Sequence, residues 1–316
     1  MVQIAGARQT TIANDIELTG TGVHTGAPAA IALYPAEADS GIRFIVPSGA
    51  RDGVVLSADY RAVSNTTLCT VLSNGNGSAV ATVEHLLAAL RGLNVDNVLI
   101  EIDSGEVPIL DGSAKPFVDA IDEAGIHELD RSRRFIRVLK PVAVSDGDSW
   151  AEIHPHDGFH LDVEIDFDTP VIGRQRMRIE VTPSSFRREL ARARTFGFMS
   201  DVEKLWAAGL ALGASLENTV AIGEDRIVNQ EGTRFPDEFV RHKALDAVGD
   251  LALSGAPLLC AYRSSRGGHK LNHRALEALF ADRAAWEAVE AARPVETGHG
   301  ELNVGLAAAS YAADRT

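Results

Sequence analysis

The sequence predicts an α+β protein made of two similar halves, and three observations support this. Each half begins with several short strands, then has a helix that opens on Val-x-His, and continues with a strand, a glycine-containing loop and a second helix. The two Val-x-His patterns lie at 83–85 and 240–242. The identity between the halves is low, and two unrelated α+β units could resemble each other equally by chance. If the repeat is real, a functional site should lie where the halves face each other.

In the first half, short apolar or alternating stretches separated by Gly, Asn, Asp and Ser predict strands. We expect these strands at residues 11–18, 29–34, 42–46 and 67–72. A turn at 73–78 leads into a helix, because apolar residues recur with helical spacing from Val83 to Gly92. A strand at 95–103 follows, and then a helix at 116–126 that opens with Pro and closes with Gly125.

Residues 129–134 carry four charges in six positions and predict a linker. Beyond it the pattern of the first half starts again. We expect strands at 135–144, 149–154, 159–167 and 175–182, a helix near Pro183, a long helix at 237–255, a strand at 256–263 and a helix at 270–280. The chain is therefore divided into a first domain at residues 1–130 and a second domain at residues 131–316.

Charge and cysteine content exclude several classes of protein. The 316 residues include 30 Lys and Arg and 44 Asp and Glu, so the net charge is 30 − 44 = −14. This balance argues against nucleic acid or an anionic membrane as the main partner. Two cysteines imply no disulfide framework. The start lacks a signal-peptide pattern, and the most apolar run, 251–262, is far shorter than the ~20 residues of a membrane span. We expect a soluble cytoplasmic protein without stable membrane insertion.

The long helix of the second half carries the strongest local signal of chemistry. His242 and Asp246 are four residues apart, so they lie on one face of the helix, and Asp250 extends the row. Asp and neutral His are common zinc ligands, and this spacing can offer two ligands to one ion. A solvated polar face would show the same spacing, but the rest of the helix is mainly apolar.

Glu84 and His85 occupy the matching place in the first half. Adjacent helical residues point about 100° apart, so the two are not expected to bind one ion together. His85 would complete a ligand set of two His and one carboxylate, with a fourth position open for water. Glu84 could then act as the base that takes a proton from that water. The alternative is a first-turn Glu favoured by the helix dipole beside a half-buried His.

Two further features suggest a site. His269 follows Gly267 and Gly268 in a loop after a strand, where it could serve as a general acid oriented by Asp250. The apolar stretch 205–216 contains two glycines. It is either a core helix that ends in a loop or a surface that binds an aliphatic group.

Several longer segments resemble the bacterial zinc-dependent UDP-3-O-acyl-N-acetylglucosamine deacetylases of lipid A biosynthesis. The resemblance covers nearly the whole chain, and its segments follow the order of the family. They are GTGVHTG at 20–26, TLCT at 67–70, TVEHLLAALRGLNVDN at 82–97, VPILDGSAKPFV at 107–118, ARTFGFM at 193–199, FVRHKALDAVGDLALSG at 239–255 and GGH at 267–269.

The resemblance implies a role for each matching residue. His85, His242 and Asp246 would hold Zn²⁺, although the same ligands also suit Fe²⁺. Glu84 would be the base, and His269, supported by Asp250, would be the acid that protonates the departing amine. The resemblance also implies that Thr195 binds the oxyanion and that Lys243 supports substrate binding. Asp166 and Phe167 would bind the uracil. Phe198, Leu210 and Leu212, in an apolar insert near 196–225, would bind the acyl chain.

The resemblance also implies the fold and the reaction. Two similar domains would each pack a small sheet on a pair of helices, with the helices sandwiched between the sheets. The enzyme would be a metal-dependent hydrolase that removes the N-acetyl group from UDP-3-O-(hydroxyacyl)-N-acetylglucosamine, giving the amine and acetate. We expect it to act as a monomer on this small-molecule substrate.

Two other functions remain open. A metal-dependent lyase similar to imidazoleglycerol-phosphate dehydratase would also have paired α+β halves, but its His-His-x-x-Glu ligand sets are not present in this chain. A non-catalytic module that binds a sugar nucleotide or acyl group would not explain a metal with an open position beside Glu84.

Overall fold

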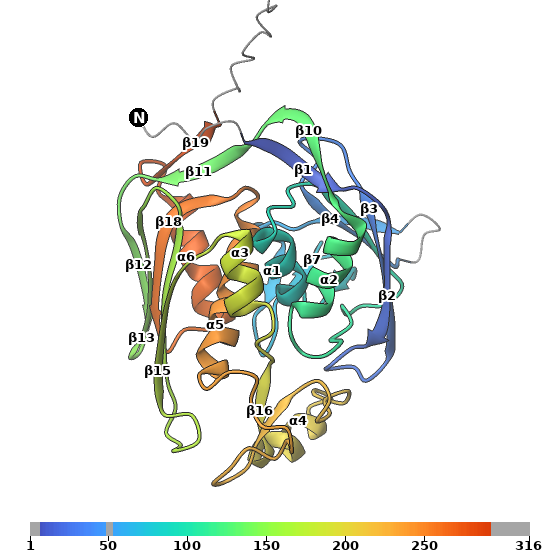
Figure 1. Cartoon of the computed structure of the whole chain (residues 1–316), viewed down its shortest axis with the longest axis vertical. Coiled ribbons are helices and arrows are strands. Elements are labelled where there is room, and N and C mark those ends of the chain that lie inside the picture. Colours follow the sequence, from blue (N-terminus) through green and yellow to red (C-terminus); the bar gives the residue numbers. More distant parts are fainter. Residues whose placement is uncertain (1–6, 49–52, 292–316) are drawn as a thin grey trace, which may run out of the picture.

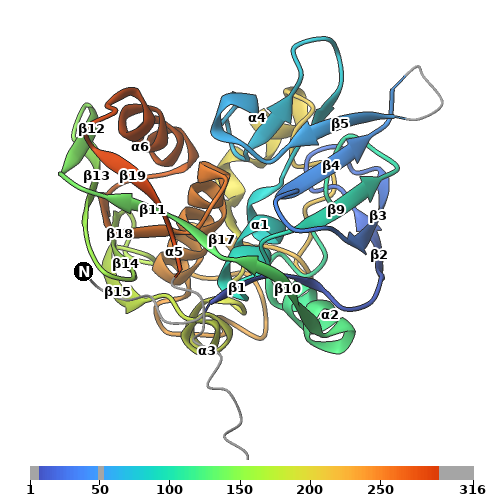
Figure 2. The same cartoon turned by 90° about the horizontal axis from the view of Figure 1, so that it is seen from above.

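A layer of helices lies between two β-sheets (Figures 1 and 2). The computed structural model describes residues 7–48 and 53–291. In these residues the α-helices are α1 (Glu84–Gly92), α2 (Lys115–Ala124), α3 (Pro183–Ser185), α4 (Val202–Ala207), α5 (Glu238–Leu251) and α6 (His269–Ala281). The mixed α+β class and the position of the helices between the sheets are as the sequence predicts.

The strands of the first half are β1 (Arg8–Ile12), β2 (Ile16–Thr21), β3 (Pro28–Pro35), β4 (Ile42–Val46), β5 (Val54–Ser57), β6 (Val63–Asn65), β7 (Val71–Ser73), β8 (Ala79–Val80), β9 (Val98–Ile102) and β10 (Ile126–Ser132). Those of the second half are β11 (Arg134–Val138), β12 (Val142–Asp146), β13 (Ser149–Pro155), β14 (Phe159–Asp166), β15 (Arg174–Glu180), β16 (Phe196–Phe198), β17 (Val220–Ile222), β18 (Leu258–Ser265) and β19 (Trp286–Glu290).

The two halves share one strand topology. In the first sheet the order is β2-β3-β9-β4-β5, and only β4 and β9 are parallel neighbours. In the larger sheet β12-β13-β18-β14-β15 repeats this order, with β14 and β18 as the matching parallel pair. The antiparallel pair β1 and β10 likewise matches β11 and β19. The repeat suggested by the two Val-x-His patterns is therefore present in the fold.

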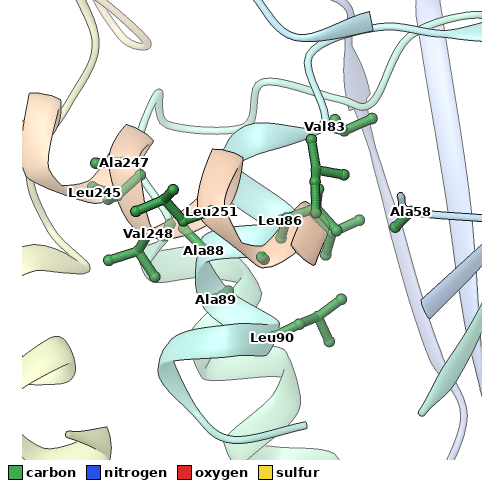
Figure 3. Packing of buried hydrophobic residues seen from close by; sticks show 14 of the residues in the cluster. Ala58, Val83, Leu86, Ala88, Ala89, Leu90, Leu245, Ala247, Val248 and Leu251 are labelled. Atoms are coloured by element: carbon green, nitrogen blue, oxygen red, sulfur yellow. The ribbon is translucent and has the colours of Figure 1, made fainter. Parts of the chain in front are cut away.

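The central helices α1 and α5 pack against each other and join the halves. Every residue of α1 is buried, as expected for a helix surrounded by protein. Figure 3 shows apolar side chains of both helices, among them Ala88 and Val248, in the region where they pack. Gly249 permits this close approach, because a Cβ atom at this position would lie 1.9 Å from the carbonyl oxygen of Glu84.

Three expected strands differ from the structure. The stretch 11–18 is interrupted by a turn in which the Asn14 side chain donates a hydrogen bond to the carbonyl of Ala124. The stretch 135–144 is also two strands, β11 and β12, separated by residues that include Pro141, which has no backbone N–H. In 67–72 the left-handed backbone of Leu68 (φ 67°) prevents a continuous strand, and β7 begins only at Val71.

The expected linker at 129–134 is wrong as a description of local structure, because most of it belongs to β10 and the start of β11. Asp130 and Arg131 lie on β10, in which no residue is fully buried, whereas Arg133 lies between the two strands and is buried. The repeated unit ends with β10 at Ser132. The division into domains at 1–130 and 131–316 stays a prediction.

No helix within the described parts of the chain is long and apolar enough to cross a membrane.

Candidate active site

His85, His242 and Asp246 meet at the contact between α1 and α5. Nε2 of His85 lies 3.6 Å and Nε2 of His242 lies 3.4 Å from Oδ1 of Asp246. The two imidazole rings are nearly perpendicular, with centroids 5.0 Å apart. All three side chains are buried. Three donor atoms from both halves of the chain thus converge on one point, with each donor atom within 4.8 Å of the others.

The chemistry of this cluster fits a bound divalent metal. Among the described residues, Oδ1 of Asp246 is buried without a hydrogen-bond partner, which is costly unless a cation satisfies it. Nδ1 of His242 lies 3.1 Å from the carbonyl oxygen of Ala193. Donation to that carbonyl leaves Nε2 free as a metal donor. Burial lowers the pKa of His242 to about 3, so its imidazole is neutral, as a metal ligand must be.

Lys243 supports the carboxylate of Asp246. Its Nζ donates a hydrogen bond of 2.8 Å to Oδ2, the oxygen that does not face the histidines. Burial alone would raise the pKa of Asp246, but its polar neighbours, among them the ammonium of Lys243, hold it well below its usual range. Asp246 is therefore an anion in the folded protein.

Glu84 begins α1 beside this cluster. Its Oε2 accepts a hydrogen bond of 3.0 Å from the backbone N–H of Thr70, while Oε1 lies 3.9 Å from Nε2 of His269. Burial raises the pKa of Glu84, which makes its carboxylate a better proton acceptor than an exposed one. Among the described residues, Glu84 is not part of the group of three donor residues.

His269 is the first residue of α6 and not a loop residue as expected, because the helix starts directly after the extended Gly268. Its Nδ1 lies 2.8 Å from Oδ2 of Asp250. Burial opposes the charged imidazolium, but Asp250 and then Glu84 outweigh it and raise the pKa of His269 to about 9. His269 is therefore protonated at neutral pH, the state that a general acid requires.

The sequence did not single out two residues that fix Asp250. The hydroxyl of Thr70 donates to Oδ1 over 2.6 Å, and the amide of Asn272 donates to Oδ2 over 2.7 Å. Thr70 lies in the TLCT segment that carried the family resemblance, which was the available signal. Asn272 follows His269 by three residues and so shares its helix face, but no pattern marked it.

An aromatic cluster lies beside the three donor residues. The ring of Phe167 packs against Phe196 and Phe198, with centroids 5.7 and 5.8 Å apart. Nζ of Lys243 lies 5.5 Å from the centre of the Phe196 ring, and that ring is 6.2 Å from the imidazole of His242. Thr195 directly precedes Phe196 in the chain, and sequence reasoning gave Phe196 no role.

Asp166, at the end of β14, is paired with Arg266, whose guanidinium donates a 2.6 Å hydrogen bond to its carboxylate. Arg266 lies shortly before His269, in the loop between β18 and α6. Of the two residues expected to bind uracil, Asp166 is therefore in an ion pair with Arg266, and Phe167 is in the aromatic cluster.

The apolar insert is enclosed by two parallel strands, β16 and β17. It projects from the helix layer and carries α4, as Figure 1 shows in yellow and orange. Its Leu212 donates its backbone N–H to the carbonyl of His24, so the insert also contacts the first half. The side chain of Leu212 is exposed, and that of Leu210 is half-buried. Other exposed apolar side chains of the insert are Met199, Trp206 and Leu216.

Comparison with known proteins identifies the family. The family model described as LpxC, UDP-3-O-acyl N-acetylglycosamine deacetylase, matches residues 9–281. The chain belongs to this deacetylase family. Curated UDP-3-O-acyl-N-acetylglucosamine deacetylases of Brucella ovis, Brucella canis and Brucella melitensis biotype 2 are 52% identical to it over 286 residues, which are 90% of this chain and 99% of each relative.

The family membership confirms the expected class of enzyme, a metal-dependent deacetylase that acts on a UDP-sugar in lipid A biosynthesis. It decides against the lyase and the non-catalytic binding module. The identity of the metal and the role of each site residue are taken up below as proposals.

Proposed function

We propose that this enzyme removes the N-acetyl group from UDP-3-O-(hydroxyacyl)-N-acetylglucosamine by metal-dependent hydrolysis at the contact between α1 and α5. The observation that supports it best is the joint position of three metal-donor residues, Glu84 and His269. A carboxylate and an imidazolium lie 3.9 Å apart beside the donor atoms, which provides a base and a separate acid at neutral pH.

His85, His242 and Asp246 would hold the metal, and zinc is the ion we propose, with iron(II) as the alternative that the same donors suit. When bound, the metal would lower the pKa of a water toward ~7 and polarise the acetamide carbonyl. His242, fixed by the carbonyl of Ala193, and Asp246, fixed by Lys243, would keep their donor atoms in place.

Glu84 would accept the proton of the attacking water at its Oε1, because Oε2 is occupied by the N–H of Thr70. His269 would donate the proton at Nε2 to the amide nitrogen as the C–N bond breaks. The products are acetate and the free amine. Asp250 would hold the His269 ring through Nδ1 and favour its charged form.

Thr195 would donate a hydrogen bond to the oxyanion formed at the acetyl carbon. Lys243, next to the aromatic cluster, would contribute to substrate binding. Asp166 and Phe167 would receive the uracil.

Phe198, Leu210 and Leu212 would contact the acyl chain. Each CH₂ group that the protein buries contributes about 0.8 kcal/mol, so an acyl chain can supply several kcal/mol after ordering costs. We also propose that the enzyme acts as a cytoplasmic monomer, which cell fractionation and sedimentation can test.

The test of this function is product analysis. The purified enzyme should release acetate and the free amine in equal amounts from the acylated UDP-sugar. Glu84→Gln keeps the size of the side chain but removes the base, and it should lower kcat about 10²- to 10⁴-fold. Equal rates for this variant and the wild type would refute the role of Glu84, and no acetate release by the wild type would refute the function.

A further inference from the structure

A second group of metal-donor side chains lies on the outer face of the larger sheet. His156 follows β13, His160 is on β14, and Glu180 is the last residue of β15. His160 and Glu180 are direct cross-strand partners, so their side chains lie on the same face. The turn at 156–158 brings His156 back beside them.

This face points away from the helix layer. Along β14, Leu161, Val163 and Ile165 are in the hydrophobic core, and α5 packs against this strand. Since side chains alternate along a strand, His160 points to the opposite side. The group is therefore separated from the proposed catalytic centre by the sheet itself.

The donor atoms have the spacing of a metal site. Oε2 of Glu180 lies 3.1 Å from Nε2 of His156 and 3.4 Å from Nδ1 of His160. Donors bound at about 2.0–2.1 Å to a tetrahedral ion are separated by about 3.3 Å. All three residues can place a donor atom within 4.8 Å of the others. They are also partly exposed, so water can fill the remaining position.

The local backbone accommodates this carboxylate closely. A Cβ atom at Gly158 would lie 2.0 Å from Oε1 of Glu180. A side chain at position 158 would therefore displace Oε1 of Glu180 from its present position. By contrast, His154 on β13 pairs with Glu152 over 2.8 Å but belongs to no group of three donors in the described residues.

We propose that His156, His160 and Glu180 form a second site, for a divalent transition-metal ion such as Zn²⁺ or Ni²⁺. Two imidazoles and one carboxylate favour these ions over Mg²⁺ and Ca²⁺, which prefer oxygen ligands. The site lies outside the machinery proposed for hydrolysis, so its loss leaves deacetylation unchanged.

Equilibrium dialysis of the metal-free full-length protein against Zn²⁺, followed by elemental analysis, tests this site. The wild type should bind two equivalents. His242→Ala, which removes a proposed catalytic ligand, should bind one. His242→Ala combined with His160→Ala should bind none, and His242→Ala combined with His154→Ala should still bind one. Glu180→Gln in place of His160→Ala provides a second test in which the side chain keeps its size.

The outcomes separate the two sites. If His160→Ala and Glu180→Gln bind as much Zn²⁺ as their parent proteins, the outer site is refuted. If His242→Ala binds none while the wild type binds one, the outer site is refuted and the catalytic ligand remains supported. Circular dichroism of each variant shows whether a loss of binding comes from unfolding, and the Glu180→Gln result then decides.

Discussion

Nδ1 of His269 lies 2.8 Å from Oδ2 of Asp250, where α6 meets α5. The opposite ring nitrogen, Nε2, is 3.9 Å from Glu84. One carboxylate thus contacts Nδ1 of the imidazole, and the other lies on the side of Nε2, the nitrogen proposed to donate the proton. Thr70 contacts both carboxylates, since its hydroxyl donates to Asp250 and its backbone N–H donates to Glu84.

This arrangement predicts the pH dependence of kcat/KM. An acid acts only when protonated, so activity should fall as the pH rises through about 9, the pKa of His269. A base acts only when deprotonated, so activity should rise with pH through the pKa of Glu84, which burial raises. Asp250→Asn removes the charge that raises the pKa of His269 and should move the alkaline limb to lower pH. An alkaline limb unchanged in Asp250→Asn and in His269→Ala would assign the acid to another group.

Replacement of a proposed ligand should remove the metal without unfolding the chain. His242→Ala and Asp246→Ala should each contain one metal equivalent less than the wild type, because two remaining donors bind weakly, while the large core persists. His154→Ala, at a histidine that belongs to no group of three donors in the described residues, is the matched control. Elemental analysis and circular dichroism measure both quantities, and wild-type metal content in both variants would contradict the ligand assignment.

Gly249→Ala tests the contact that joins the halves. The added methyl group would lie 1.9 Å from the carbonyl of Glu84, so α1 and α5 must separate. Overpacking of this kind costs about 1–3 kcal/mol in the free energy of unfolding. Gly105→Ala is the control, since its Cβ would lie 3.9 Å from its nearest neighbour. Urea unfolding compares the free energies of unfolding of the two variants. Equal values would show that stability does not depend on the close approach of α1 and α5.

The sequence predicted the relative positions of site residues where these residues lie close together in the chain. His242 and Asp246 share a helix face because they are four residues apart, and that spacing survives folding. The support from Thr70, 180 residues from Asp250, depends on how the halves pack, which no local pattern encodes. The strands were predicted well where they are uninterrupted, as at Ile42–Val46. Periodicity failed at Asn14 and Pro141, because the few polar residues there end one strand, and the next strand begins only a few residues later.

The apolar insert should determine selectivity for the acylated substrate. Leu212→Asp or Leu210→Asp should lower kcat/KM for the acylated UDP-sugar by about tenfold or more, since the loss of contact with two CH₂ groups is worth about 1.6 kcal/mol. UDP-N-acetylglucosamine should be a poor substrate throughout and should change little. Leu139→Asp, at an exposed position outside the insert, is the control for an added charge. Equal activity of the wild type on both substrates would show that the insert does not determine selectivity for the acyl chain.

Hydrolysis should depend on a metal held by residues of both halves. Acetate release from the acylated UDP-sugar, measured before chelation, after complete removal of metal and after addition of Zn²⁺, tests it most directly. We predict that activity is lost with the metal and returns on addition of Zn²⁺ in the wild type and in His160→Ala, but not in His85→Ala or His242→Ala. Full activity of the metal-free wild type would contradict the dependence of hydrolysis on a metal.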